Sequence, residues 1–236
     1  MNGKRDYLRI AGIFLIAVLL VAGTGGLARA NDTMDARHLV EKARMSLDSF
    51  DKAKEMNAFR DLLKDAKGVF IAPQILKGAF IVGASGGSGV FMVRDATTGK
   101  WSQPAFYTIG SASFGLQIGG QASEVVLLAM TDRGVAALLS NSVKLGADVG
   151  VAAGPVGMGA SAATANLSAD IISFARSKGL FAGISLDGAV VKVRDSLNHA
   201  YYRADVTPTD ILVKRRVANR HAQPLISAIS TDAKRG

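Results

Sequence analysis

The sequence predicts an α+β fold in which N-terminal helices pack on a glycine-rich, mainly antiparallel β-sheet that is strongly curved or closed. Residues 34–66 carry apolar side chains at helical spacing, with Lys and Asp between them. From residue 69, short β-branched runs alternate with Gly, Asp and Asn, and short polar turns between strands favour antiparallel pairing. The 26 glycines favour turns, bulges and closely approaching strands over helix interiors.

The first 30 residues have the organisation of a signal peptide. Lys4, Arg5 and Arg9 form a positive start, residues 10–21 are apolar, and residues 28–30 form an Ala-x-Ala cleavage site. We therefore expect cleavage after Ala30 and an exported protein, periplasmic or secreted, that lies peripherally on a membrane. The alternative is an uncleaved anchor helix, because residues 10–28 are uncharged and just long enough to span a bilayer.

The charge of the remaining chain is moderately positive. The whole chain carries +9, and the leader holds four basic residues and one acidic residue, a net +3, which leaves +6 for residues 31–236. A basic exported protein suits an acidic partner surface, and in that compartment we expect anionic lipid and no nucleic acid. Surface charge that serves only to keep the protein soluble explains the same net charge equally well.

The helical part is expected to contain two helices, or one helix bent near Asn57. Asn57 is a candidate N-cap for the second stretch and Gly68 a candidate stop signal. The apolar positions of the two stripes are Leu39, Ala43, Leu47, Phe50, Phe59, Leu62, Leu63 and Ala66.

The strand candidates follow from residue 69 onward. Asp187-Gly188 predicts a hairpin between the last two candidates, and residues 95–100 predict a further turn. The candidates are residues 69–72, 79–84, 89–94, 105–109, 114–119, 145–152, 180–186 and 189–194.

Three later segments have helical signals. Residues 132–141 begin after a Thr131 or Asp132 cap, and Thr207-Pro208 predicts an N-cap followed by Pro at the first helical position. Residues 218–230 predict a further helix broken by Pro224. Residues 198–202 are expected to form a polar loop. We expect one domain over residues 31–236: a helical part (31–68), a sheet-rich core (69–214) and a tail (215–236).

Catalytic and metal signals are weak. Residues 83–87 match the Gly-x-Ser-x-Gly pattern around Ser85, but that motif needs a strand, a sharp turn and a helix, and here a strand-like run follows. A serine hydrolase using Ser85 is therefore a remote alternative, and no catalytic residue is assigned. The three histidines are scattered and there is no cysteine, so we expect no metal site and no cofactor.

The helical part is also basic. A basic amphipathic helix buries its apolar face at a membrane interface while Lys and Arg attract anionic lipid. The competing interpretation is that these faces pack on the sheet, and the five interspersed carboxylates weaken the basic signal. The candidate lipid-binding residues are Lys42, Arg44, Lys52, Lys54, Arg60, Lys64 and Lys67.

Residues 66–214 resemble the SYLF domain, also known as the yeast actin-binding-protein-like domain. The similarity is carried, in order, by residues 66–69, 83–89, 99–104, 115–120, 141–146, 151–155 and 178–188, the last being Lys-Gly-Leu-Phe-Ala-Gly-Ile-Ser-Leu-Asp-Gly. The order and spacing of these stretches fit across nearly all of the chain after residue 31.

The resemblance implies lipid binding without catalysis. Eukaryotic members bind phosphoinositides, some bind and bundle actin, and their membrane contact is attributed to an N-terminal amphipathic helix, which corresponds loosely to residues 39–67. The bacterial-style leader makes actin and phosphoinositides poor candidates here. We expect an anionic bacterial phospholipid, or a host lipid met after secretion. The alternative is a structural or protein-interaction component of the cell envelope that self-associates through exposed sheet edges.

Overall fold

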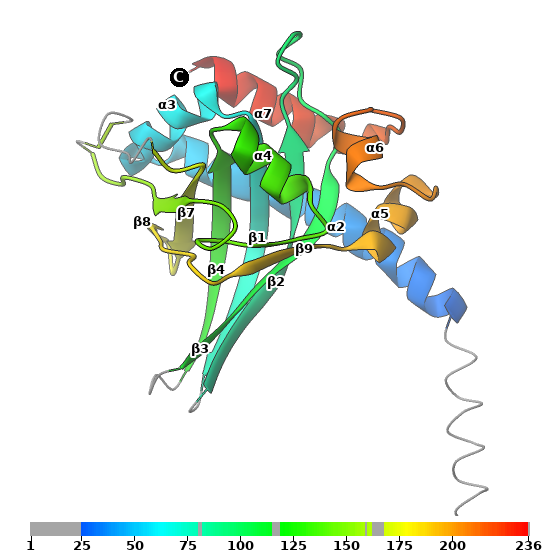
Figure 1. Cartoon of the computed structure of the whole chain (residues 1–236), viewed down its shortest axis with the longest axis horizontal. Coiled ribbons are helices and arrows are strands. Elements are labelled where there is room, and N and C mark those ends of the chain that lie inside the picture. The colour runs from blue at the N-terminus through cyan, green and yellow to red at the C-terminus, as the bar shows by residue number, and fades with distance from the viewer. Residues whose placement is uncertain (1–24, 80–81, 115–118, 159, 162–167, 236) are drawn as a thin grey trace, which may run out of the picture.

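The N-terminal helices lie against one face of the sheet in the computed structural model, which describes residues 25–79, 82–114, 119–158, 160–161 and 168–235 (Figure 1). Helix α2 (Gly25–Lys52) is the longest helix among the described residues. A 3-10 turn, η1 (Lys54–Met56), follows it, and α3 (Asn57–Asp65) completes the helical part. Of the two expected alternatives, two helices or one helix bent near Asn57, the first is what forms. Asn57 is not the N-cap, however: it is the first residue of α3, and its side chain accepts a hydrogen bond from Arg60.

In the described part of the chain, nine strands form one curled sheet that is antiparallel at every pairing except β6 with β7. The strand order is β5-β9-β3-β2-β1-β4-β7-β6, with β8 paired to β7. The strands are β1 (Gly68–Ala79), β2 (Val82–Val93), β3 (Ala105–Phe114), β4 (Gly119–Ala129), β5 (Ser142–Lys144), β6 (Val151–Ala153), β7 (Ile171–Ser177), β8 (Leu180–Gly183) and β9 (Val190–Val193). The predicted α+β architecture with a curved, mainly antiparallel sheet is confirmed.

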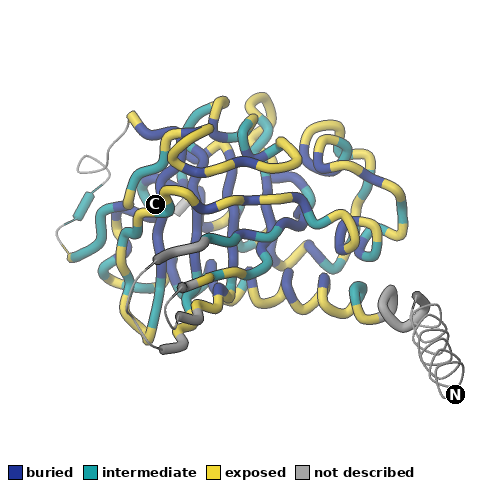
Figure 2. Tube along the Cα trace, turned by 60° about the horizontal axis from the view of Figure 1, so that its bottom comes forward, coloured by how far each residue is buried: buried dark blue, intermediate teal, exposed yellow. Residues whose placement is uncertain are grey.

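Both faces of the central strands are buried. In β1, Val69 and Ile71 join a core shared with α2, α3 and the C-terminal helix, whereas Phe70 and Ala72 join a second core on the opposite face. Side chains alternate between faces along a strand, so a continuously apolar run fits a strand covered on both sides. Figure 2 shows buried stretches running through these strands and exposed stretches on the outer surfaces of the helices.

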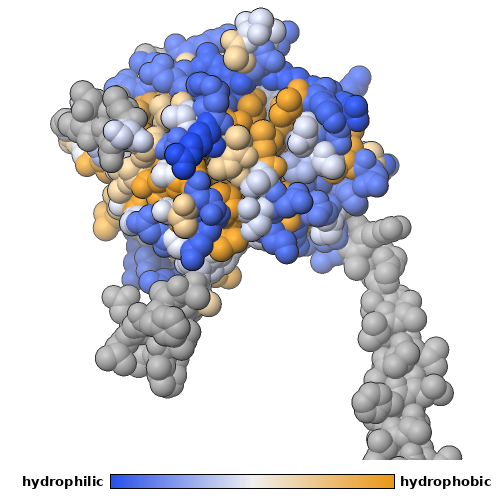
Figure 3. Space-filling view, in the orientation of Figure 1, coloured by the Kyte–Doolittle hydropathy of each residue, from blue (hydrophilic) through white to orange (hydrophobic). Residues whose placement is uncertain are grey.

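The remaining helices cover the two faces of the sheet. Helix α4 (Asp132–Leu139) lies over the second core, and Figure 3, which views this side, shows apolar side chains gathered in mid-face with hydrophilic ones around them. The others are α5 (Asp195–Tyr202), α6 (Pro208–Leu212), the 3-10 turn η3 (Arg220–Ala222) and α7 (Gln223–Arg235).

A β-bulge interrupts β1 at Pro73. The register shifts against β2 between Ile71 and Gln74, and against β4 at the same level. Proline cannot donate a ladder hydrogen bond, so within a sheet it fits at a bulge. The bulged backbone lies close over β2, because a Cβ on Gly87 would lie 2.1 Å from the Gln74 carbonyl oxygen. Only glycine allows this approach without displacement of the backbone.

Three of the local signals at turns and caps are confirmed. The hydroxyl of Thr131 accepts from the Gly134 amide at the start of α4, and Thr207 forms a capping box with Asp210 around Pro208. In the 95–100 turn, the Asp95 carboxylate accepts from two following amides.

Several strand and loop predictions need correction. Residues 69–72 and 79–84 are not separate strands, because β1 continues through the bulge to Ala79 and β2 begins at Val82. Strands β4 and β7 were not among the candidates. The predicted strand 114–119 spans the end of β3 and the start of β4, with residues 115–118 outside the described part.

The Asp187-Gly188 hairpin does not form, although Gly188 has a φ of +83° in a turn. Strand β8 pairs with β7, whereas β9 pairs with β3 and β5. Residues 198–202 are helical rather than a loop, since they belong to α5, the helix whose buried residues are Leu197, Asn198 and Tyr201. Pro224 lies at the second position of α7 and does not break it.

Candidate functional site

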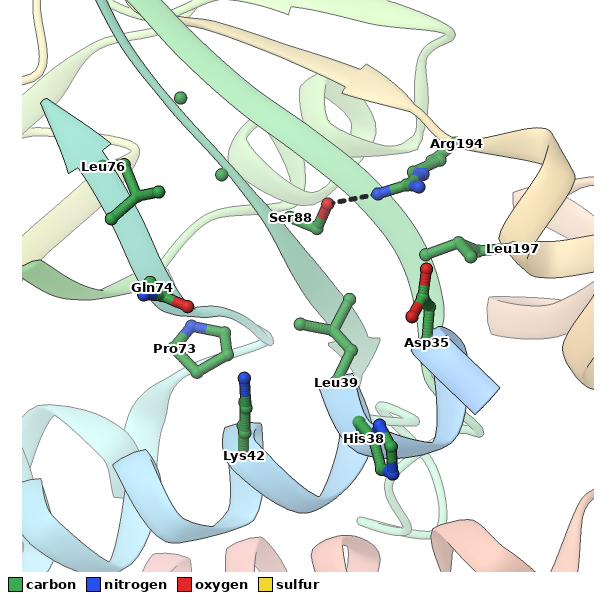
Figure 4. A pocket seen from close by; sticks show the side chains of 12 residues that line it. Asp35, His38, Leu39, Lys42, Pro73, Gln74, Leu76, Ser88, Arg194 and Leu197 are labelled. Carbon is green, nitrogen blue, oxygen red and sulfur yellow. Dashed lines mark hydrogen bonds between the residues drawn. The ribbon is translucent and has the colours of Figure 1, made fainter. Parts of the chain in front are cut away.

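A groove runs between α2 and the sheet on the side opposite α4. Two adjoining hollows, of about 310 and 330 Å³, share Lys42, Pro73 and Gln74. Figure 4 shows the first hollow, with Leu39 and Lys42 projecting from α2, Leu76 standing on β1, and Arg194 on the far side beside Ser88.

The bulge and the glycines of β2 make this groove. Gln74 and Leu76 follow the bulge and face α2, while Gly86 and Gly87 on the neighbouring strand leave the floor without side chains. The long strands extend past the helices (Figure 1), so the groove opens toward the projecting part of the sheet.

The walls of the groove carry an excess of positive charge. The four cations are Lys42, Arg176, Lys178 and Arg194, and the two carboxylates are Asp35 and Glu124, a net +2. Arg176 pairs with Glu124 at 3.0 Å. Within the described part of the chain, no ion pair joins the other three cations to a carboxylate.

Arg194 is held in position by hydrogen bonds. Its guanidinium Nη1 donates to the Ser88 hydroxyl at 2.6 Å, and its backbone amide donates to Phe106. Arg194 lies between β9 and α5, so the groove joins α2, the β1–β2 pair and this distant segment. A cation held in place beside a groove floor that includes two glycines can bind an oxyanion by charge-assisted hydrogen bonds.

The seven predicted lipid-binding residues differ in their local contacts. Lys42 lies in the groove, and Lys54 is exposed on η1. Four others pair with carboxylates: Arg44 and Lys52 with Asp48, Lys64 with Asp61, and Lys67 with Asp132.

Arg60 has a structural position. Its Nη1 donates to the carbonyl oxygens of Asp51 and Ala53 at the C-terminal end of α2, and its Nη2 contacts Asn57. The last carbonyls of a helix lack intrahelical partners, and a cation there is favourable. Arg60 therefore joins α2 to α3, and its role in binding lipid stays a prediction.

Sequence reasoning missed Arg194, Lys178 and Ser88 as groove residues. Arg194 was assigned only as the end of a strand, and Lys178 only as part of a Gly-containing stretch. No local pattern joins them to Lys42, because the sheet order brings them together. The one available signal was Pro73 beside the glycines of residues 83–89, which marks an irregular, close-packed part of the sheet.

Ser85 lies in the middle of β2. Its hydroxyl is 2.8 Å from that of Ser111 on β3, and β2 continues to Val93 without the turn and helix that a nucleophile elbow needs. His199 pairs with Asp205 at 2.9 Å, while His38 lines the groove. The structural condition for a Ser85 hydrolase is therefore not met.

A chain of polar contacts joins three helical segments on the other side of α2. The His221 Nε2 atom lies 3.0 Å from Glu41 Oε1, and its Nδ1 lies 3.3 Å from the Tyr201 hydroxyl. Burial raises the pKa of Tyr201, which keeps the phenol protonated. This contact ties α2 to η3 and α5.

Two further findings concern the described residues alone. No group of three or more potential metal ligands comes together in them. None of their helices is both long and apolar enough to cross a bilayer, and the apolar leader at residues 10–21 lies outside them. Helix α2 runs across the predicted cleavage site, and cleavage after Ala30 stays a prediction.

The fold and groove define an α+β domain with a long helix across a curled, glycine-rich sheet. A family model described as Ysc84, Las17-binding protein actin regulator, matches residues 110–232, just over half of the chain. The chain belongs to this family, which confirms the SYLF resemblance.

Several curated relatives are similar to this chain, and two of the three described here carry the Ysc84 name. "SH3 domain-containing YSC84-like protein 1" of Homo sapiens is 35% identical over 153 residues, which cover 64% of this chain and 44% of that protein. "Protein YSC84" of Saccharomyces cerevisiae is 32% identical over 177 residues, covering 73% of this chain and 37% of that protein. "SH3 domain-containing protein PJ696.02" of Schizosaccharomyces pombe is 34% identical over 167 residues, which cover 69% of this chain and 37% of that protein. The chain thus spans less than half the length of these relatives.

Proposed function

We propose that this protein is a non-enzymatic lipid-binding protein that contacts anionic phospholipid headgroups at a membrane surface. The observation that carries this proposal is the groove, where Lys42, Lys178 and Arg194 have no carboxylate partner in the described structure. The +6 charge of residues 31–236 adds a longer-range attraction in the same direction.

The expected energetics are those of an electrostatic membrane contact. Each Lys or Arg near an anionic bilayer contributes about 1 kcal/mol, and the attraction decays within a Debye length, so salt weakens it. Three unpaired cations on one groove therefore support a moderate, reversible association.

We also propose that the protein works outside the cytoplasm, in the periplasm or as a secreted protein. The leader-like residues 1–30 support this, because they carry a positive start, an apolar stretch and an Ala-x-Ala site. Terminal sequencing of the protein from producing cells should give a chain that begins at Asn31. A protein that keeps residues 1–30 would instead support the uncleaved-anchor alternative.

Vesicle co-sedimentation tests the lipid proposal. A chain beginning at Asn31 keeps every buried core residue among those whose burial the structure describes, since the first of them is Ala36. It should bind phosphatidylglycerol vesicles at low salt, bind them less at high salt, and bind neutral phosphatidylcholine vesicles poorly. Equal binding to both vesicle types, or binding to neither, contradicts the proposal.

Charge reversal locates the contact. Lys42→Glu combined with Lys178→Glu should weaken binding to anionic vesicles more than a single reversal at Lys77, which lies on the opposite face of β1. If the double reversal has no more effect than twice a single control, general charge rather than the groove drives binding.

A second candidate is a protein-interaction or structural component of the envelope. The names of the relatives favour it, since the family description names Las17 binding and one yeast relative is "LAS seventeen-binding protein 3". Sedimentation velocity of the Asn31 chain tests self-association. Unchanged detergent resistance of the envelope after gene deletion would count against a structural role.

A further inference from the structure

The face of the sheet beneath α2 changes chemical character along the strands. Directly paired residues of an antiparallel sheet point to the same face. Nearest α2, Gln74 pairs with Ser88, which pairs with Thr108, and these three form a polar row. Two residues further along, about 7 Å away at strand rise, lies a second row.

The second row has small or apolar residues alone. Leu76 pairs with Gly86 on one side and with Ala122 on the other, and Gly86 pairs with Gly110. Leu76 is 57% exposed although it is a large aliphatic side chain, and Ala122 is also exposed. Ala84, one step beyond Gly86 on the same face, is exposed as well.

The polar row, the apolar row and the cations together match the chemistry of an amphiphilic ligand, which has a charged headgroup next to an apolar chain. Arg194 contacts the polar row through Ser88, and Lys42 reaches the groove from α2. The apolar row leads away from these charges toward the projecting end of the sheet. Groups that attract a phosphate therefore lie next to a strip that gains free energy when an alkyl chain covers it.

We propose that the groove and the apolar row hold one molecule of an anionic phospholipid. Its phosphate lies between Lys42 and Arg194, and one acyl chain lies along Gly86, Leu76 and Ala122. This rests on the proposed function and goes beyond it, because the protein then binds a single lipid as well as a charged surface. Charge complementarity at the groove selects the lipid over an uncharged alkyl ligand.

Substitution of Gly86 is the most specific test of the proposed contact between the acyl chain and the apolar row. A Cβ there has only the Ile109 carbonyl oxygen near it, at 3.7 Å, which is ordinary van der Waals contact. A larger side chain at this position therefore fills the strip without a backbone clash. The matched control is Ser111→Leu, a large apolar side chain on the opposite face of the neighbouring strand.

The probe is dihexanoylphosphatidylglycerol below its micelle concentration, titrated into the Asn31 chain by calorimetry. We expect saturable binding of one lipid per chain, weakened about tenfold or more by Gly86→Leu and by Lys42→Glu. Ser111→Leu and Lys77→Glu should leave the affinity unchanged. Far-UV circular dichroism and thermal unfolding establish that each variant is folded.

The comparison ligands separate the parts of the proposal. Glycerol phosphate, which lacks acyl chains, should bind at least tenfold more weakly than the lipid. Equal affinities for the two would overturn the acyl-chain contact, as would an unchanged affinity in a folded Gly86→Leu variant. Binding to anionic vesicles without binding to the monomeric lipid overturns this inference and leaves the membrane-surface function standing. If the protein binds neither anionic vesicles nor the monomeric lipid, both this inference and the proposed membrane-surface function are contradicted.

Discussion

Gly87 has no room for a side chain, because the bulge at Pro73 brings the Gln74 carbonyl oxygen within 2.1 Å of where a Cβ would lie. Gly87→Ala should therefore lower the free energy of unfolding by about 1–3 kcal/mol, the usual range for overpacking. Gly86→Ala, one residue away and uncrowded, should change it by less than about 0.5 kcal/mol. Urea unfolding of both variants makes the comparison. Equal effects would show that the bulge backbone moves freely.

Asp210 makes stability depend on acid pH. Hydrogen bonds from Thr207 are the main cause that lowers its pKa to about 2, from an ordinary value of 3.8. A carboxyl group whose pKa is lower in the folded state stabilises the fold above pH 3.8, and this stabilisation is lost as pH falls toward 2. The stability difference between the wild type and Asp210→Asn should shrink over that interval.

The control for Asp210 is Thr207→Val, which removes the hydroxyl that donates to the carboxylate. In that background the loss of stability between pH 4 and 2 should be smaller. An unchanged acid profile in both variants would show that the capping box does not couple to this titration.

Residues whose role is local were predictable from the sequence. Thr131, Thr207 and Asp95 act on amides two to three positions away, so short-range spacing is sufficient. Arg194 and Lys178 were not predictable as groove residues, because their neighbours come from other strands and from α2. The prediction that Asn57 caps α3 was wrong for a physical reason. Helix α3 begins one residue earlier than a capping Asn57 would require, and the Asn57 side chain contacts Arg60 instead.

At the scale of elements, the end of α2 depends on Arg60. Arg60→Ala removes donors to two helix-end carbonyls and should cost about 1–2 kcal/mol of unfolding free energy. Arg60→Lys should recover only part of this, because an ammonium lacks the planar fork of a guanidinium. Lys54→Ala is the exposed control and should stay within about 0.5 kcal/mol. Thermal melts distinguish the three, and equal melting temperatures would contradict the assigned role.

The existence of the helices was easier to predict than the limits of the strands. Residues 125–129 and 171–175 are buried on both faces, so they lack the alternation that marks a half-exposed strand. The candidate strand 69–72 stops just before Pro73, whereas in the structure this proline occupies a bulge within one longer strand. The Asp187-Gly188 turn signal was correct about the turn and wrong about pairing, since pairing depends on the rest of the sheet.

At the scale of the whole molecule, the two cores share their central strands. Alternate residues of β1, β2 and β4 enter one core or the other, so neither core can lose its packing without exposing the strands of the second. We therefore expect one cooperative unfolding transition. Trp101, the single tryptophan, lies in the α2-side core, and its fluorescence should change at the same urea concentration as far-UV circular dichroism. Separate midpoints would indicate independent units.

The overall architecture followed from the sequence, whereas strand order and groove did not. Composition and periodicity indicate which surfaces are buried, and thus an α+β class. The placement of β1 and β2 between β3 and β4 depends on long-range pairing. The groove is a consequence of that order, together with the position at which α2 crosses it.

The close fit between the Pro73 bulge and Gly87 also limits the order in which descendants of this sequence can change. A side chain at position 87 becomes acceptable only after β1 has lost its extra residue, and that deletion would turn Gln74 and Leu76 to the other face. Intermediates with one change and not the other are expected to be poorly folded. Substitution at either position is therefore contingent on the history of the other, whichever ligand the groove holds.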